Sequence, residues 1–160
     1  MTEPKKPDVM DAALRYLEHR ARTEQEVRDK LADAGYEPEE TEACLTRLKD
    51  LHYVDDTEYA LAYLRRSLEK RRGRLRYYRE LKERGISRET AQQAVYEYED
   101  EENADLSAVE YENAREEAAR VLAGRELTDK EKARAGRRLA SLGYEMSLIY
   151  SVLGTFRKDS

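Results

Sequence analysis

The chain has 160 residues, of which 41% are charged and 39% hydrophobic, and its net charge is −5. This balance excludes one large apolar core and favours narrow apolar stripes on helices. A single cysteine, Cys44, excludes an internal disulfide framework, and no stretch approaches the roughly 20 apolar residues of a membrane span.

The N-terminal residues 1–8 form a predicted tail without the apolar core of a signal peptide. Together with the lone cysteine, this indicates a cytoplasmic protein that does not contact membranes. The three prolines are Pro4, Pro7 and Pro38. Because proline is costly inside helices, its absence after Pro38 favours an all-α chain.

Residues 9–54 predict a first unit of three helices. An apolar stripe from Met10 to Leu17 marks the first helix, and Thr23 with Glu26 has the spacing of a capping box before the second. Gly35 suits the left-handed position just past the end of that second helix, where a Cβ would cost energy. The third helix follows the glycine and places Cys44 in the core as a small residue.

Residues 55–100 and 101–157 repeat this pattern, and residues 158–160 form a predicted tail. Gly85 and Gly143 occupy the position of Gly35, and in each unit a leucine stands four residues earlier. Small or apolar residues recur nine and ten positions after each glycine, which places them on one helical face. The second helix starts at Thr128 in the third unit and at Gly73, a weaker cap, in the second.

These matches predict an all-α chain of three tandem three-helix repeats, with about nine helices. Such units bury part of their apolar faces against neighbours and stack into an elongated curved body. The alternative is one irregular helical bundle in which the similarity arises by chance. We favour the repeat because the apolar positions, the turn glycine and the caps agree.

Positive charge is concentrated in the second unit. Residues 65–88 carry eleven Lys or Arg against three Glu. Arg74 and Arg76 fall in the first turn of a helix capped by Gly73, where the helix dipole disfavours cations by roughly 0.3–1 kcal/mol. A local rule broken in this way marks a candidate functional site.

The candidate contact residues for phosphates or for an acidic protein face are Arg71, Arg72, Arg74, Arg76 and Arg79. The alternative is a solvated helix surface on which arginine stems cover apolar patches.

Negative charge is concentrated just beyond, in residues 97–117, which carry ten acidic residues and one Arg. We interpret this acidic segment as a solvated linker and helix start before the third unit. The alternative is a surface that meets basic residues on a partner. In either case it would repel phosphates and argues against strong direct DNA binding.

Residues with the spacing of a catalytic set are absent from the sequence. His19 and His52 lie in different units, and Cys44 matches the core positions Ala94 and Val152. The sequence also lacks a metal-ligand spacing and both glycine-rich phosphate-binding motifs. We therefore expect a protein that is not an enzyme and that needs no cofactor or metal.

Three stretches resemble the bacterial RecX regulators of the RecA recombinase. They are "LEHRARTEQEVRDKL" at residues 17–31, "YVDDTEYALAYL" at 53–64 and "RELKERGISRETAQQAV" at 79–95. Residues 137–153, "RRLASLGYEMSLIYSVL", resemble the looser C-terminal repeat of that family. One departure is His52, where the family often has glycine; histidine tolerates a left-handed turn better than most residues.

The resemblance implies a modular all-α protein that binds the helical groove of RecA–DNA filaments. It also implies inhibition of RecA strand exchange and ATP hydrolysis, with effects on DNA repair and the SOS response. We expect a monomer whose partner is the RecA filament, with DNA contacted directly or through RecA. The alternative is a direct DNA-binding helix–turn–helix protein, although the helix after Gly85 has few basic residues and ends acidic.

Overall fold

The structure is a computed structural model that describes residues 6–157, and this part of the chain forms nine helices and no strand. Residues 1–5 of the predicted N-terminal tail and the predicted tail 158–160 lie outside the described residues. The helices are α1 (Val9–Leu17), α2 (Glu24–Asp33), α3 (Pro38–Asp50), α4 (Asp56–Glu69), α5 (Arg74–Glu83), α6 (Arg88–Glu102), α7 (Leu106–Leu122), α8 (Asp129–Ser141) and α9 (Met146–Leu153).

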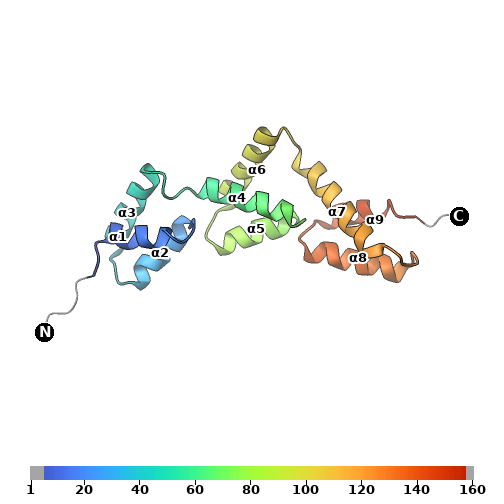
Figure 1. Cartoon of the computed structure of the whole chain (residues 1–160), viewed down its shortest axis with the longest axis horizontal. Coiled ribbons are helices and arrows are strands. Elements are labelled where there is room, and N and C mark those ends of the chain that lie inside the picture. The colour runs from blue at the N-terminus through green and yellow to red at the C-terminus, as the bar shows by residue number, and fades with distance from the viewer. Residues whose placement is uncertain (1–5, 158–160) are drawn as a thin grey trace.

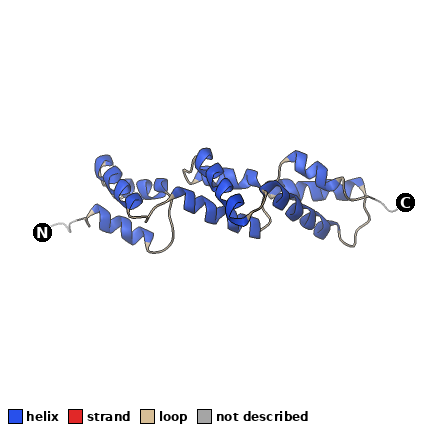
Figure 2. Ribbon diagram, turned by 90° about the horizontal axis from the view of Figure 1, so that it is seen from above, coloured by secondary structure: helices blue, strands red, loops and turns tan. Residues whose placement is uncertain are grey.

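The helices form three groups that follow one another along the long axis of the molecule (Figure 1). We call α1–α3 unit one, α4–α6 unit two and α7–α9 unit three. The view from above shows the same three groups in one row (Figure 2). The prediction of an elongated all-α body built from tandem three-helix repeats is thus confirmed.

Local sequence explains where the middle helix of each unit begins and ends. The Thr23 hydroxyl accepts from the Glu26 N–H at 3.1 Å, and the Glu26 carboxylate accepts from the Thr23 N–H at 3.0 Å, which completes the predicted capping box of α2. The three turn glycines all adopt the left-handed conformation, with φ of +90° at Gly35, +83° at Gly85 and +97° at Gly143. His52 is also left-handed, with φ of 63°.

Each unit encloses a hydrophobic cluster, and that of unit two also includes Leu106 from the start of α7. The largest side chains at the centres, all at most 2% exposed, are Leu31 and Leu48 in unit one, Leu64, Tyr77 and Leu81 in unit two, and Leu139, Tyr144 and Ile149 in unit three. Cys44 belongs to the first cluster, where burial raises the pKa of its thiol. It is therefore a core residue, as predicted, and not an activated nucleophile.

The contact between units one and two, here called the first joint, joins the start of α2 to the end of α5. The Thr23 hydroxyl donates to the Arg84 carbonyl at 2.8 Å, just before the turn glycine Gly85. The Glu24 N–H donates to the Asp56 carboxylate at the start of α4, at 2.9 Å. The Asp55–Asp56 pair thus has a structural role at this junction, because Asp55 caps α4 and Asp56 links it to α2.

The second joint repeats this arrangement between the start of α5 and the end of α8. The Gly73 N–H donates to the Leu142 carbonyl at 2.8 Å, and the Leu75 N–H donates to the Gly143 carbonyl at 3.0 Å. A Cβ on Gly73 would lie 2.5 Å from the Gly143 carbonyl carbon. The weak cap at Gly73 therefore has a packing reason, because a side chain there would push the two units apart.

Candidate binding surface

The structure divides the five candidate arginines into two sets. Arg71 and Arg74 face α7, where Arg71 pairs with Glu116 at 2.8 Å and Arg74 pairs with Glu110 at 2.5 Å. The Glu110 side chain is 2% exposed and the Arg74 side chain 24%. Both arginines therefore bridge units two and three, and little of the Arg74 charge is available to a partner, whereas the Arg71 side chain is 42% exposed.

Glu110 also resolves the unfavourable placement of cations in the first turn of α5. Its carboxylate accepts from the Arg74 N–H, the first backbone donor of α5, at 3.1 Å. A buried carboxylate from the next unit thus supplies the negative charge that the sequence of α5 lacks. The unfavourable placement of Arg74 in the first turn of α5 is thus explained by the joint between units two and three. A ligand site is not needed to explain it.

The remaining three arginines gather with further cations on one surface. Burial lowers the pKa of the Arg76 guanidinium, and repulsion from Arg72, Arg79 and Arg138 lowers it further. Arg76 pairs with Glu80 at 2.5 Å, whereas Arg72 and Arg79 have no ion pair within the described residues. Arg79 is exposed at the surface.

A hollow beside these arginines extends the surface onto α4. Its lining is Tyr63, Arg66, Ser67, Lys70, Arg72, Glu80 and Arg84, around about 280 Å³. We call the cations of both places the basic cluster, which consists of Arg66, Lys70, Arg72, Arg76, Arg79, Arg84 and Arg138. Glu80 is the one carboxylate that lines the hollow, so the cluster has a large excess of positive charge. Fixed guanidinium groups of this kind bind phosphates and carboxylates through paired N–H donors.

The acidic segment contains the predicted helix start before the third unit, at Leu106, but most of it is helix and not a solvated linker. Residues 97–117 form the end of α6 and much of α7, and Glu110 and Glu117 are buried at 2% and 4% exposure. Glu101 and Glu102 both pair with Arg65 of α4. The segment meets basic residues, as in the alternative reading, but those residues belong to this chain. It therefore neutralises one side of unit two, and among the described residues it pairs with one member of the basic cluster, Arg138, through Glu117.

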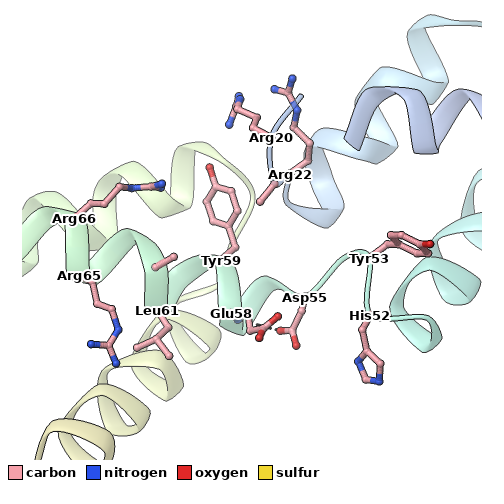
Figure 3. Close-up of a pocket in the computed structure, with 12 residues that line it drawn as sticks. Arg20, Arg22, His52, Tyr53, Asp55, Glu58, Tyr59, Leu61, Arg65 and Arg66 are labelled. Carbon is pink, nitrogen blue, oxygen red and sulfur yellow. Dashed lines mark hydrogen bonds between the residues drawn. The ribbon is translucent and has the colours of Figure 1, made fainter. Parts of the chain in front are cut away.

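A cleft of about 450 Å³ opens between units one and two (Figure 3). The loop before α2 contributes Arg20 and Arg22, and α4 contributes Arg65 and Arg66. In Figure 3, Tyr59 stands between Arg66 and the pair from the loop. Asp55 and Glu58 also line the cleft, so it presents both signs of charge and is less selective for anions than the basic cluster.

Two of these four cleft arginines, Arg22 and Arg66, have no ion pair among residues 6–157. Arg20 pairs with Glu26 at 3.4 Å and Arg65 with the α6 carboxylates. Arg22 instead lies over the Tyr16 ring at 4.1 Å, and its Nε is buried without a hydrogen-bond partner among the described residues. Arg66 lies 5.6 Å from the centre of the Tyr63 ring.

Some of these residues were not selected from the sequence. Arg20 and Arg22 lie two residues apart in residues 17–31, the first of the three stretches that resemble RecX. This spacing was a signal that the count of charges in residues 65–88 did not include. Arg138 gave no such signal, because it lies in unit three and approaches Arg76 only after the units pack.

Residues 6–157 contain no helix long and apolar enough to cross a bilayer. The same part of the chain has no group of three or more His, Cys, Asp or Glu arranged to hold a metal ion.

Two family models match the chain in succession. The first three-helix domain of RecX matches residues 10–48, and the second three-helix domain of RecX matches residues 55–95. This chain belongs to the RecX family. The two RecX domains coincide with the helices of units one and two.

Individual relatives agree with the family models. The regulatory protein RecX of Listeria welshimeri is 32% identical over 123 residues, which cover 74% of this chain and 46% of that protein. The regulatory protein RecX of Levilactobacillus brevis is 33% identical over 144 residues, covering 89% of this chain and 52% of the relative. The chain thus spans about half the length of these RecX relatives.

Solved RecX structures share the fold of all three units. The crystal structure of RecX from Lactobacillus salivarius has a TM-score of 0.80 with 21% identity, and covers 92% of this chain and 93% of that one. A second crystal structure of a regulatory protein RecX has a TM-score of 0.76 with 20% identity, covering 92% and 72% respectively.

Proposed function

We propose that this chain is a non-catalytic regulator of RecA that binds the RecA–DNA filament and inhibits its activity. Membership of the RecX family, together with the regulatory names of the relatives, supports RecA as the partner. The elongated row of three units supports a binding mode along the filament groove, because such a body spans successive subunits of a helical partner. The cytoplasm is the expected compartment.

The observation that carries the contact surface is the basic cluster. Among the described residues, five of its seven cations have no ion pair, whereas Arg76 pairs with Glu80 and Arg138 with Glu117. Carboxylates of α6 and α7 neutralise the other side of unit two. A surface of this kind attracts acidic protein faces and nucleic-acid phosphates, and attraction weakens as salt screens the charges. We propose Arg72, Arg76 and Arg79 as contact residues, and we assign Arg71 and Arg74 mainly to the second joint.

The test is ATP hydrolysis by RecA on single-stranded DNA, with this chain titrated in. We expect hydrolysis to fall at substoichiometric amounts of the chain. The double variant Arg72→Glu/Arg79→Glu should shift the inhibition curve to concentrations at least about tenfold higher, because two guanidinium contacts become repulsive. Full activity of RecA at every concentration of the folded wild-type chain would refute the proposed function.

A matched control reverses the same amount of charge elsewhere. Arg47 of α3 and Arg115 of α7 are exposed and lie outside the basic cluster, so Arg47→Glu/Arg115→Glu should inhibit nearly as well as wild type. If both double variants inhibit like wild type, the contact surface is wrong even though the regulator role stands.

Direct DNA binding is a second candidate, favoured only by the basic cluster. In the helix–turn–helix form of this idea α6 would be the recognition helix, but its one basic residue is Arg88 and it carries six acidic residues. Binding to bare DNA that falls steeply with salt, without inhibition of RecA, would favour this candidate.

A further inference from the structure

The two joints share one arrangement, in which the start of a middle helix contacts the turn glycine and a carboxylate of the following unit. At the two ends of the molecule, each side of this arrangement is present without the other. At each joint the first N–H of a middle helix donates to a carboxylate of the following unit, from Glu24 to Asp56 and from Arg74 to Glu110. A residue in the first turn of the same helix lies against the next turn glycine. These pairs are Gln25 with Gly85 and Arg76 with Gly143.

Unit three presents the first half of this arrangement at the far end of the row. Thr128 caps α8 as Thr23 caps α2, and it accepts from the Glu131 N–H at 3.2 Å. Lys130 takes the place that Gln25 has in α2, and it is exposed. Figure 1 shows this end of α8 at the opposite end of the molecule from α2.

Unit one presents the second half at the near end of the row. The Gly35 carbonyl corresponds to the Gly143 carbonyl that accepts a backbone N–H at the second joint. At Gly35 the Lys6 ammonium donates to this carbonyl at 2.7 Å instead. Asp11, in the first turn of α1, is exposed and belongs to the helix that supplies the joint carboxylate in the other units.

The near end has an acidic surface, and the far end offers it one exposed cation. Around the Gly35 turn the exposed residues include Asp33, Glu37 and Glu39. Lys130 is exposed in the first turn of α8, where it can pair with carboxylates of the Gly35 turn in a second copy. The four arginines that line the hollow of about 440 Å³ between α7 and α8 pair with Glu117 and Glu131 of their own unit, so they add little to this attraction.

We propose that the unit-three end of one copy docks on the Gly35 turn and α1 of a second copy, forming a third joint between chains. The occupant of each free end is thus a second copy of this chain, and the Lys6 side chain must leave the Gly35 carbonyl first. The contact is head to tail, so each added copy exposes a new free end and the assembly grows as a linear chain. Lys6 acts as a competing cap that keeps the dilute chain monomeric.

The first test is sedimentation equilibrium of the isolated chain over a concentration series from about 1 µM to about 1 mM, a range chosen for weak contacts. Wild type should associate weakly, and Lys6→Ala should lower the dissociation constant by about tenfold, because it removes the competing hydrogen bond from a charged donor. A Lys6→Ala chain that keeps the mass of one copy throughout would overturn the proposal.

Lys130→Glu provides the complementary variant. Glutamate suits the start of a helix, so α8 should stay folded, but the new carboxylate would face the acidic Gly35 end. Added to Lys6→Ala, it should abolish association. Arg137→Glu reverses the same charge on the same helix, farther from its start, and should leave association intact. Equal effects of both reversals would refute the head-to-tail geometry.

Cysteine pairing tests the geometry directly in a Cys44→Ala background. Chains with Ala34→Cys and chains with Lys130→Cys should form mixed disulfide dimers when combined, and neither should dimerise appreciably alone. Gln25→Cys/Arg84→Cys within one chain serves as the positive control, since these positions flank the first joint. None of these readouts needs RecA, so this proposal and the proposed function fail independently.

Discussion

The second joint should fail when a single methyl group is added to Gly143. Two costs combine in Gly143→Ala. The first is backbone strain, because φ is +97°, and a left-handed conformation costs alanine about 1–2 kcal/mol. The second is overlap, because the new Cβ would lie 2.7 Å from the Arg76 backbone nitrogen, which cannot move away without shifting α5.

Relief of that overlap requires the units to separate. The two backbone hydrogen bonds from Gly73 and Leu75 would then be lost, each worth about 0.5–1.5 kcal/mol. We expect Gly143→Ala to lower the free energy of unfolding by about 3–4 kcal/mol, measured by urea denaturation with circular dichroism.

Gly124→Ala separates the two costs. Gly124 has φ of +71°, and a Cβ there would meet nothing within 4 Å, so only the strain of about 1 kcal/mol applies. Hydrogen exchange should show the Gly73 and Leu75 amides exposed in Gly143→Ala and still protected in Gly124→Ala. Equal destabilisation by the two substitutions, or protected amides in both, would refute the close-packed joint.

Three further predictions concern the joints. Glu110→Gln should lower the free energy of unfolding by about 2–3 kcal/mol in urea denaturation, because it leaves the half-buried Arg74 guanidinium without its carboxylate. A decrease under about 0.5 kcal/mol would show that this ion pair is unimportant for stability. Burial raises the pKa of Asp56 from 3.8 to about 6, so the folded chain binds this proton more tightly and the free energy of unfolding should fall as pH rises through about 6. In Asp56→Asn this decrease in the free energy of unfolding should be smaller by about 1 kcal/mol, a value that allows for the partial exposure of Asp56. If the free energies of unfolding of both proteins changed equally with pH, Asp56 would not be the group responsible. Thr23→Val should destabilise the chain by about 1–2 kcal/mol more than Thr128→Val, because both lose a helix cap but only Thr23 also donates across a joint; equal losses would argue against that bond.

Features set by neighbouring residues were predictable from the sequence. The capping box at Thr23, the left-handed turns at Gly35 and His52, and the burial of Cys44 depend on short spacings and on apolar periodicity. The repeat frame then predicted the three-unit fold, because the same local signals recur in the same order.

Features set by contacts between units were not predictable in the same way. Glu110 caps a helix that starts 36 residues earlier, so the charge pattern of α5 alone suggested a ligand site at Arg74. Arg138 joins the basic cluster only through the packing of α8 against α5. The assignment of the basic cluster to a partner stays a prediction. The proposed contact residues are now Arg72, Arg76 and Arg79, because Arg71 and Arg74 pair with carboxylates of α7.

The head-to-tail order of the middle helices gives the body a direction. α2, α5 and α8 all begin toward the unit-three end and finish toward the unit-one end (Figure 1). Because its two ends differ, reversing the body along a directional filament would present different residues to every filament subunit. Under the proposed function, binding to a filament formed on a DNA strand with a 5′ and a 3′ end should therefore occur in one orientation, and a label at either terminus would report that orientation.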